Sequence, residues 1–155
     1  MEYLNIEIRE MTKSDLPAVM EIENLCFVAP WTEKDMISEI EDKQFKNCWV
    51  IELSFQGKTA IGGFCIYYQT FSSGTIAQIA VHPTLQHRQL GTAMMDEIIN
   101  DCYAKKIENL TLEVRENNKT AIEFYLKNGF EKILVKNRYY SNGDNAIYMI
   151  RKVAI

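Results

Sequence analysis

Two passages of the chain combine residue types that can bind a phosphate and move protons. The first is IAQIAVHPTLQHRQLGTAMM, from Ile76 to Met95, and the second is LEVRENNKTAIEFYLKNGF, from Leu112 to Phe130. The first sets a glycine-containing loop between a strand pattern and a helix pattern, and such a loop can cradle phosphate with its backbone N–H groups. The second carries a carboxylate, Glu113, and a phenol, Tyr125, which can accept and donate a proton. We therefore expect an acid and a phenol within reach of a bound pyrophosphate.

The loop of the first passage is expected to bind an anion. Residues 76–82 alternate in the manner of a half-buried strand, and Pro83 ends that strand because proline cannot donate to the ladder. A helix is predicted to begin at about Gln89. Its apolar residues recur at helical spacing and are Leu90, Met94, Met95, Ile98 and Ile99. A helix N-terminus carries unpaired N–H groups and about half a positive charge, so the loop from Gln86 to Thr92 can receive a pyrophosphate.

Individual residues of this loop support the same interpretation. Gly91 allows close backbone approach, and His87 and Arg88 add side-chain donors, of which the Arg88 guanidinium is permanently charged. The alternative is an ordinary strand-to-helix turn, which a short glycine-containing loop would also produce. A metal site is not expected, because His82 and His87 stand five residues apart with no cysteine or carboxylate cluster beside them.

The second passage is predicted to place its carboxylate on a strand and its phenol on a helix. Apolar and polar residues alternate through 110–115, so Glu113 is expected on the face opposite the leucines. A helix then starts at Asn117 or Asn118, carries Tyr125, and ends at Asn128-Gly129. The alternatives are a solvated carboxylate, a core tyrosine and, at Asn118, a simple helix cap.

The elements that must hold these residues follow from the periodicity of the whole chain. Strands are predicted at 4–10, 47–54, 58–69, 74–82, 108–115, 130–139 and 145–153, and helices at 14–27, 33–41, 89–105 and 118–128. Thr12 or Ser14 opens the first helix, and Thr32 with Asp35 forms a capping-box-like start for the second. Asn142-Gly143 marks a hairpin turn between the last two strands. This order predicts an α/β chain with a mixed sheet.

Length and composition predict one small domain spanning residues 1–155. The 155 residues are 47% hydrophobic, which is enough to supply a single core. Cys26, Cys48, Cys65 and Cys102 form no CxxC pair and are expected to be reduced core residues of a cytoplasmic protein. The net charge of −4 argues against nucleic-acid binding and suits a basic peptide substrate. Neither a signal peptide nor a membrane-spanning stretch is expected.

The loop QHRQLG, Gln86 to Gly91, resembles the acetyl-CoA signature of the GCN5-related N-acetyltransferase (GNAT) superfamily. That signature is Q or R, two variable residues, G, one variable residue, then G or A. Gln89 stands where the pattern has its first glycine, and its backbone N–H can still donate provided that the residue sits at negative φ. A second register, RQLGTA from Arg88 to Ala93, fits the pattern without exception but lengthens the loop by two residues. The first register is preferred, because GTAMM then falls where relatives have GTALL.

Nearly the whole chain resembles the RimI-like branch of this superfamily, the bacterial ribosomal-protein-alanine N-acetyltransferases. The motifs that carry the resemblance are IREMTKSDLPAVMEIE near the start, PWT at 30–32, IAVHP, LEVRENNKTAIEFYLKNGF and the pair Tyr139-Tyr140. The resemblance implies a single GNAT domain, with a mixed, mostly antiparallel sheet flanked by helices, and acetyl-CoA as cosubstrate. In place of the family's Glu-Asp-Ala the chain has Asp144-Asn145-Ala146, which exchanges a carboxylate for an amide at position 145.

The resemblance also implies roles for individual residues. Glu113 would be the general base and Tyr125 the general acid. Trp31, Tyr139 and Tyr140 would flank the first residue of the acceptor peptide, or would otherwise pack in the core. The residues expected to hold acetyl-CoA are Ile79, Ala80, Val81, Gln86, His87, Arg88, Gln89, Leu90, Gly91, Thr92 and Asn118.

Acetyl transfer from a thioester to an amine needs a neutral amine, a polarised carbonyl and a proton for the leaving thiolate. An α-amino group with a pKa of about 7.7–8.0 is neutral in roughly one molecule in ten at pH 7, against fewer than about one in a thousand for lysine. Deprotonation of an N-terminal amine by the base is therefore less demanding than deprotonation of a lysine. Glu113, directly or through a water, would take the ammonium proton, and Tyr125 would protonate the thiolate. Backbone N–H groups of Ile79 to Val81 would hold the thioester oxygen.

Three functions stay open at this point. The leading hypothesis is acetylation of a protein N-terminus, the N-terminal alanine of a small-subunit ribosomal protein. A small amine such as a polyamine, an amino sugar or a drug could use the same cradle. The third is a non-catalytic acetyl-CoA-binding module. The sequence predicts neither a nucleic-acid nor a membrane partner, and it leaves the oligomeric state open.

Overall fold

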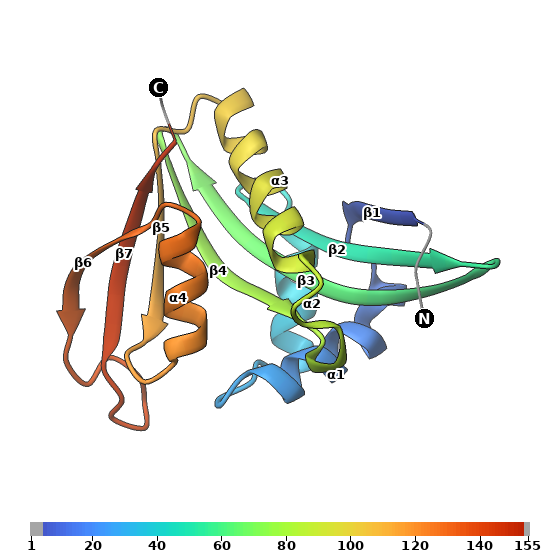
Figure 1. Ribbon diagram of the computed structural model, residues 1–155, viewed down its shortest axis with the longest axis horizontal. Coiled ribbons are helices and arrows are strands. Elements are labelled where there is room, and N and C mark those ends of the chain that lie inside the picture. The colour runs from blue at the N-terminus through green and yellow to red at the C-terminus, as the bar shows by residue number, and fades with distance from the viewer. Residues whose placement is uncertain (1–4, 154–155) are drawn as a thin grey trace. The chain divides into compact units, whose positions relative to one another are not determined.

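Within residues 5–153, which the computed structural model describes, seven strands form one sheet in the order β1-β2-β3-β4-β5-β7-β6 (Figure 1). The strands are β1 Asn5–Glu10, β2 Lys46–Phe55, β3 Lys58–Thr70, β4 Ser73–Val81, β5 Asn109–Arg115, β6 Glu131–Lys136 and β7 Ala146–Lys152. The helices are α1 Leu16–Cys26, α2 Glu33–Glu41, α3 Leu90–Ala104 and α4 Lys119–Lys127. The predicted α/β fold with a mixed, mostly antiparallel sheet is confirmed, since β4 pairs with β5 in parallel and four other strand pairs are antiparallel.

The starts of the first two helices follow the sequence signals. α2 has the predicted bounds, and the side chains and backbones of Thr32 and Asp35 form the expected capping box. The first helix, predicted at 14–27, is divided into a 3-10 turn at Lys13–Asp15 and α1. Thr12 opens that turn, and its N–H donates to the Asp15 carboxylate at 2.8 Å. The described residues do not include residue 4 of the predicted first strand. They also leave out both ends of the predicted 1–155 domain.

The chain divides into two compact units, each of which is described by itself. The described part of the first unit comprises residues 5–68 and 78–98, and that of the second comprises 69–77 and 99–153. Strand β4 therefore begins in the second unit and ends in the first.

The first unit is built on the antiparallel strands β1, β2 and β3. β2 and β3 join through the predicted Gln56-Gly57 turn, where both residues have positive φ. The Arg9 guanidinium ties this unit together by pairing with Asp15 and Glu52, at 2.9 Å from each. Its buried side chains include Val19, Ile22, Met36, Val50, Ile51, Leu53, Phe64, Ile66, Met94 and Met95.

One glycine of this unit is required by close backbone approach. A Cβ atom at Gly63, on β3, would lie 2.7 Å from the carbonyl oxygen of Ala80, on β4. Any side chain at this position would force the two backbones apart. Gly63 thus determines how closely β3 can approach residues 79–81 of β4, which are predicted to bind acetyl-CoA.

The second unit centres on β5, which pairs with β4 on one side and β7 on the other. The parallel pairing with β4 runs from Ser73↔Asn109 to Ile76↔Leu112, and β7 pairs antiparallel along all of β5. α4 ends at Asn128 and Gly129, with Gly129 at φ +88°, which confirms the predicted C-cap. Its buried side chains include Leu110, Leu112, Ile122, Tyr125, Phe130 and Met149.

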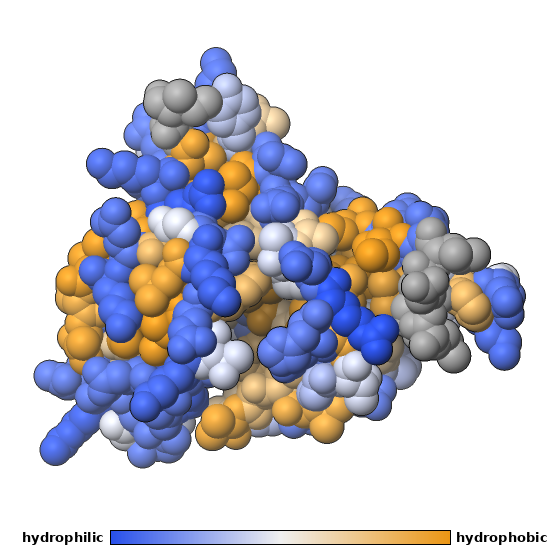
Figure 2. All heavy atoms as spheres, in the orientation of Figure 1, coloured by the Kyte–Doolittle hydropathy of each residue, from blue (hydrophilic) through white to orange (hydrophobic). Residues whose placement is uncertain are grey.

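The edge strand β6 is shorter than the predicted 130–139 strand, because it ends at Lys136. Arg138 takes φ +51° and its N–H donates to the Asn145 side chain at 2.9 Å, so the chain leaves the ladder. The consecutive apolar residues at 133–135 are each about half exposed. Figure 2 shows apolar surface, in orange, on the left side of the view where β6 lies in Figure 1.

The four cysteines are free thiols, as expected, but only three of them are buried. Burial raises the pKa of Cys48 to about 12 and that of Cys102 to about 11. Cys26 corrects the expectation of a core residue, because it lies half-buried at the end of α1 with its thiol donating to the Val81 carbonyl at 3.4 Å. Among the described helices, none is both long and apolar enough to cross a membrane.

Candidate active site

The predicted phosphate loop lies between β4 and α3, as the sequence indicated. A 3-10 turn at Pro83–Leu85 follows the strand, and α3 begins at Leu90, one residue after the predicted start. The His82 side chain caps that turn by accepting the Thr84 N–H at 3.2 Å. The N-terminal N–H groups of a helix of 15 residues therefore follow directly on the loop.

Two residues of the loop have the left-handed backbone conformation. His87 has φ +66° and Gln89 has φ +67°. The condition set for Gln89, a negative φ, is therefore not met. Glycine adopts this conformation without strain, and a glutamine there costs about 1 kcal/mol. The left-handed backbone at position 89 favours the QHRQLG register, because its first glycine would fall there, whereas most of RQLGTA lies inside α3.

The side chains of the loop differ in what they contact. The Gln86 amide donates back to the Val81 carbonyl at 3.4 Å and so helps to close the loop on the end of β4. His87, Arg88 and Gln89 are exposed, while Leu90 is buried and anchors the first turn of α3. This arrangement suits a phosphate group, because the backbone is held from within and the charged side chain of Arg88 is at the surface.

The three residues predicted to meet the thioester lie on the last part of β4. Buried and half-buried positions alternate along this strand, so Ala80 is buried while Ile79 and Val81 are half-buried. The Val81 carbonyl accepts from both Cys26 and Gln86. These contacts fix the direction of the peptide planes at the end of the strand.

Glu113, the predicted base, is held by two partners in the second unit. Lys136 Nζ lies 2.9 Å from Glu113 Oε1, and the Tyr139 hydroxyl donates to Oε2 at 2.6 Å. Partial burial acts to raise the pKa of Glu113, but the bonds from Tyr139 and Lys136 outweigh it and hold that pKa below its usual value. The carboxylate is therefore ionised at neutral pH.

Lys136 was not predicted from the sequence, where a lysine in EKILVK gives no signal beyond an edge strand. Its ammonium lies 5.3 Å from the centre of the Tyr139 ring and 5.0 Å from that of Tyr148, in addition to the pairing with Glu113. Two aromatic faces and a carboxylate together make a favourable environment for a cation.

Tyr125, the predicted acid, is buried on α4 and packs edge-to-face against Phe124 and Phe130, with ring centres 5.5 Å and 5.7 Å away. Burial raises the pKa of this phenol, so it keeps its proton at physiological pH. The packing is that expected of a tyrosine in the core, and the retained proton is what a general acid needs. Asn118 caps α4 by accepting the Ala121 N–H at 3.2 Å, which confirms the capping alternative at that position.

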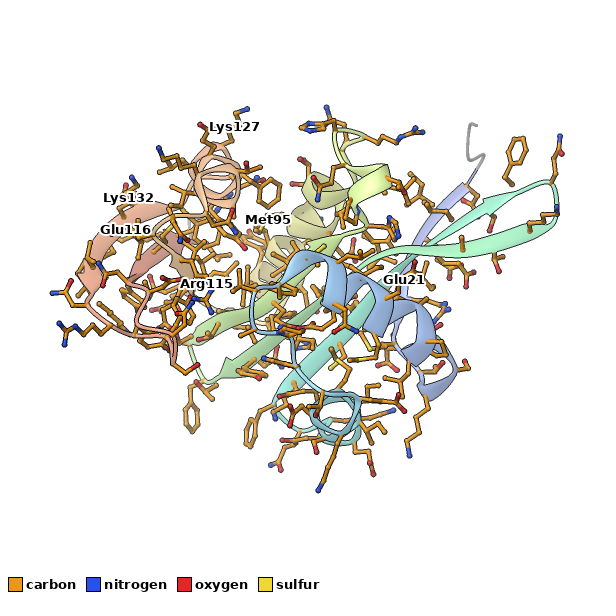
Figure 3. The ribbon with its side chains drawn as sticks, turned by 90° about the horizontal axis from the view of Figure 1, so that it is seen from below. Glu21, Met95, Arg115, Glu116, Lys127 and Lys132 are labelled. Carbon is orange, nitrogen blue, oxygen red and sulfur yellow. The ribbon has the colours of Figure 1, made fainter. Side chains whose placement is uncertain are left out.

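The hairpin loop that carries the predicted peptide-binding tyrosines is tied to the end of β5. Arg115, labelled in Figure 3, pairs with Asp144 at 2.8 Å and stacks on the Tyr140 ring at 3.9 Å. Asn145, the amide that replaces the family's carboxylate, donates to Glu116 at 3.2 Å. Tyr140 is half-buried under Arg115, whereas Tyr139 is about half exposed.

Trp31, the third predicted acceptor residue, lies between α1 and α2 in the first unit. Its backbone N–H donates to the carboxylate of Glu23 at 2.9 Å, and the Gln78 amide donates to the same oxygen at 2.9 Å. Glu23 was not predicted either. A signal existed, since Glu23 follows Leu16 and Val19 on the apolar face of α1 where a carboxylate is out of place.

Each unit thus brings some of the predicted residues together. The second unit joins Glu113 to Tyr139 directly, and the first joins the predicted phosphate loop, residues 86–92, to the end of β4. The described residues hold no group of three or more histidines, cysteines or acids placed to bind a metal; His82 instead faces Glu21 at 3.6 Å.

Comparison with known proteins gives the family. The profile of the Acetyltransferase (GNAT) family matches residues 16–130. The chain is 31% identical over 137 residues to the ribosomal protein bS18-alanine N-acetyltransferase of Escherichia coli K12, with 88% of each chain covered. Among solved structures, it is similar to the ribosomal-protein-S18-alanine N-acetyltransferase from Escherichia coli (TM-score 0.83, 28% identity, 97% and 96% of the two chains) and to Ard1 from Thermoplasma volcanium (TM-score 0.85, 26% identity, 97% and 99%). These matches confirm the resemblance drawn from the motifs. The chain belongs to the acetyltransferase (GNAT) family.

Proposed function

We propose that residues 1–155 form one N-acetyltransferase domain that transfers acetyl from acetyl-CoA to the N-terminal α-amino group of a protein. The observation that carries this proposal is the hydrogen bond from Tyr139 to Glu113, which joins a residue proposed to touch the acceptor with the proposed base. The acceptor class follows the relatives, whose names give the alanine of ribosomal protein bS18 as the modified residue. The substrate is then the N-terminal alanine of a ribosomal protein, modified in the cytoplasm.

The phosphate loop is proposed to bind the pyrophosphate of acetyl-CoA. Support comes from the two left-handed residues before α3 and from the helix N-terminus that follows them. Arg88 and His87 would add donors from their side chains, and Asn118 would add an amide from the start of α4. Residues 86–92 would contribute mainly backbone N–H groups, with Gln89 in the left-handed conformation that the glycine of the signature adopts without strain.

The proton transfers are assigned to two groups of the chain. Acetyl-CoA supplies an acetyl group activated as a thioester. Glu113, directly or through a water, takes a proton from the ammonium of the acceptor, so that the nitrogen lone pair can form the new C–N bond. Tyr125 gives its proton to the sulfur as the C–S bond breaks, and the second proton that the nitrogen loses passes through water to the Tyr125 phenolate. The N–H groups of Ile79 to Val81 stabilise the oxygen of the tetrahedral intermediate.

The acceptor is proposed to bind with its first side chain among Trp31, Tyr139 and Tyr140. Tyr139 suits this role because it is exposed and its hydroxyl is already directed at Glu113. Tyr140 would act as support, since Arg115 covers its ring. We expect these three aromatic residues to leave room for a small first side chain such as that of alanine.

The test is release of free CoA thiol when the protein is mixed with acetyl-CoA and a short peptide that begins with alanine. The matched control is the same peptide with a blocked N-terminus, and a third reaction contains a polyamine. Release with the free peptide alone is the expected result. Faster release with the polyamine would replace the proposal by small-amine acetylation. Acetyl-CoA binding without release from any acceptor would indicate a binding module.

A further inference from the structure

The buried carboxylate of Glu23 carries an inference that rests on the proposed function and extends it. Glu23 lies near the end of α1 and is 0% exposed. A carboxylate placed wholly inside a protein costs several kcal/mol unless its oxygens are well bonded. Leu16 and Val19 lie on the same face of the helix, and both are buried apolar residues, as packing alone would favour. The position therefore calls for a role other than filling the core.

One oxygen of Glu23 joins three segments of the first unit. Its Oε2 accepts the backbone N–H of Trp31 and the side-chain amide of Gln78, each at 2.9 Å. Trp31 belongs to the loop between α1 and α2, and Gln78 belongs to β4. We call Glu23, Gln78 and the Trp31 N–H the Glu23 brace.

The same residue holds both ends of the loop that joins α1 to α2. The Glu23 carbonyl accepts the Phe27 N–H at 3.1 Å, where α1 ends, and its side chain accepts the Trp31 N–H. Between these two bonds the loop is exposed, and the Val28 side chain is 73% exposed. Thr32 then caps α2. The position of the loop backbone at Trp31 thus depends on the Glu23 carboxylate.

Two buried oxygen atoms of the brace lack a hydrogen-bond partner among the described residues. Within residues 5–153, the Oε1 atoms of Glu23 and Gln78 are buried and receive no hydrogen bond. Both donors to Glu23 are neutral, and burial raises the pKa of its carboxyl. A neutral Glu23 can still accept both bonds at Oε2 and leaves no charge in the interior.

We infer that Glu23 is a positioning residue for the acceptor. Through the Trp31 N–H it sets the backbone of the α1–α2 loop, and through Gln78 it locks that loop to β4 one residue before Ile79. The loop that would hold the acceptor's first residue and the strand segment that would hold the thioester oxygen are thereby fixed to one another. Loss of the brace loosens acceptor binding and leaves the phosphate loop at 86–92 intact.

The experiment compares three variants of the full chain. Glu23→Ala removes the brace. Glu23→Gln keeps a side-chain oxygen that can accept the Trp31 N–H and the Gln78 amide. Val19→Ala is the matched control, because it removes a wholly buried side chain of the same helix that takes no part in the brace. Each variant is measured for acetyl-CoA Kd, for peptide KM and kcat, and for hydrogen exchange at the Trp31 amide.

The expected result is a rise of about tenfold in peptide KM for Glu23→Ala, from loss of a hydrogen bond to the loop, with acetyl-CoA Kd changed less than about twofold. Exchange at the Trp31 amide should become about tenfold faster, as expected for a bond that opens locally. Glu23→Gln should restore both values, and Val19→Ala should change neither.

Three outcomes would overturn the inference. The first is an equal rise in KM for Val19→Ala, which would show a general effect of loosening α1. The second is unchanged exchange at Trp31 in Glu23→Ala. The third is faster exchange with unchanged KM, which would leave a brace that does not position the acceptor. If the native protein acetylates only small amines, the proposed function fails, while the exchange data and the KM for such an amine still decide the inference.

Discussion

The two units of the chain each hold one carboxylate of particular interest, and the two carboxylates have opposite surroundings. Glu23 is wholly buried and accepts hydrogen bonds from two neutral donors. Glu113 has a side chain that is 25% exposed, pairs with the Lys136 ammonium and accepts the Tyr139 hydroxyl. Burial raises the pKa of Glu23, whereas the partners of Glu113 lower its pKa in spite of partial burial.

These opposite surroundings suit the same residue type to two purposes. A carboxyl group without contact to solvent cannot exchange protons readily, but it can hold backbone groups in place. A carboxylate that is ionised and partly exposed can meet an incoming ammonium and take its proton. Environments that push the pKa values of two like groups apart are a common basis for dividing roles between them. We therefore expect substitutions at Glu113 to act on turnover and substitutions at Glu23 to act on acceptor binding.

The largest effect is expected from Glu113→Gln. The amide cannot take a proton, so turnover at pH 7 should fall by about 100-fold, with a smaller loss at pH 9 where the α-amine of the acceptor is already neutral. The measurement is kcat for an alanine-initiated peptide across this pH range. Glu123→Gln, an exposed carboxylate of α4, serves as the control. A defect of the same size at both pH values would mean that Glu113 orients the substrate and is not the base.

A second, smaller effect is expected from Lys136→Met. Lys136 helps to lower the pKa of Glu113, so its removal should raise that pKa and move the acid limb of the kcat/KM profile to higher pH. The loss of activity should be severalfold near the acid limb and small at pH 8. Lys136→Arg should retain the native profile.

The control for this prediction is Lys132→Met on the same strand. Lys132 is exposed on β6 and is labelled in Figure 3. It carries the same charge as Lys136, so its substitution reproduces the change in net charge without the contact to Glu113. Equal shifts of the acid limb in the Lys132 and Lys136 variants would assign the effect to overall charge and contradict the proposed role of the ion pair.

A third effect concerns Tyr139, which links the proposed base to the proposed acceptor site. Tyr139→Ala removes both the ring and the hydroxyl and should raise peptide KM by about tenfold. Tyr139→Phe keeps the ring, so it should retain most of the affinity and move the acid limb upward as Lys136→Met does. Tyr103→Ala, an exposed tyrosine of α3, is the control. An unchanged KM in Tyr139→Ala would remove this residue from the acceptor site.

The sequence predicted most elements of the fold because their signals are local. The capping box of Thr32 and Asp35 defined α2, and Asn128-Gly129 defined the end of α4. The prediction for the last strand pair was less accurate, because the left-handed backbone of Arg138 depends on Asn145, seven residues away. Local patterns carry no information about such a contact.

The candidate site was predictable to the extent that it rests on motifs. Glu113, Tyr125 and the phosphate loop stand in recognisable patterns, and their roles stay predictions. Lys136 and Gln78 could not be found in this way, since each is defined by a partner on a different strand or helix. Glu23 is the intermediate case, because its place on an apolar helix face was visible but its partners were not.

The smallest effect, and the most direct comparison of the two carboxylates, is the pH dependence of stability. Glu23 has a raised pKa, so its contribution to the free energy of unfolding is complete below the ordinary value of 4.5 and is lost as pH rises through its folded-state pKa. Glu113 has a lowered pKa, so its contribution is present above 4.5 and is lost as pH falls through its folded-state pKa.

Urea unfolding of the native protein, Glu23→Gln and Glu113→Gln from pH 3 to 8 measures both contributions as differences from native. The native advantage over Glu23→Gln should shrink as pH rises, and the advantage over Glu113→Gln should grow. Slopes of the same sign would mean that the two carboxylates do not differ in the way that their contacts indicate.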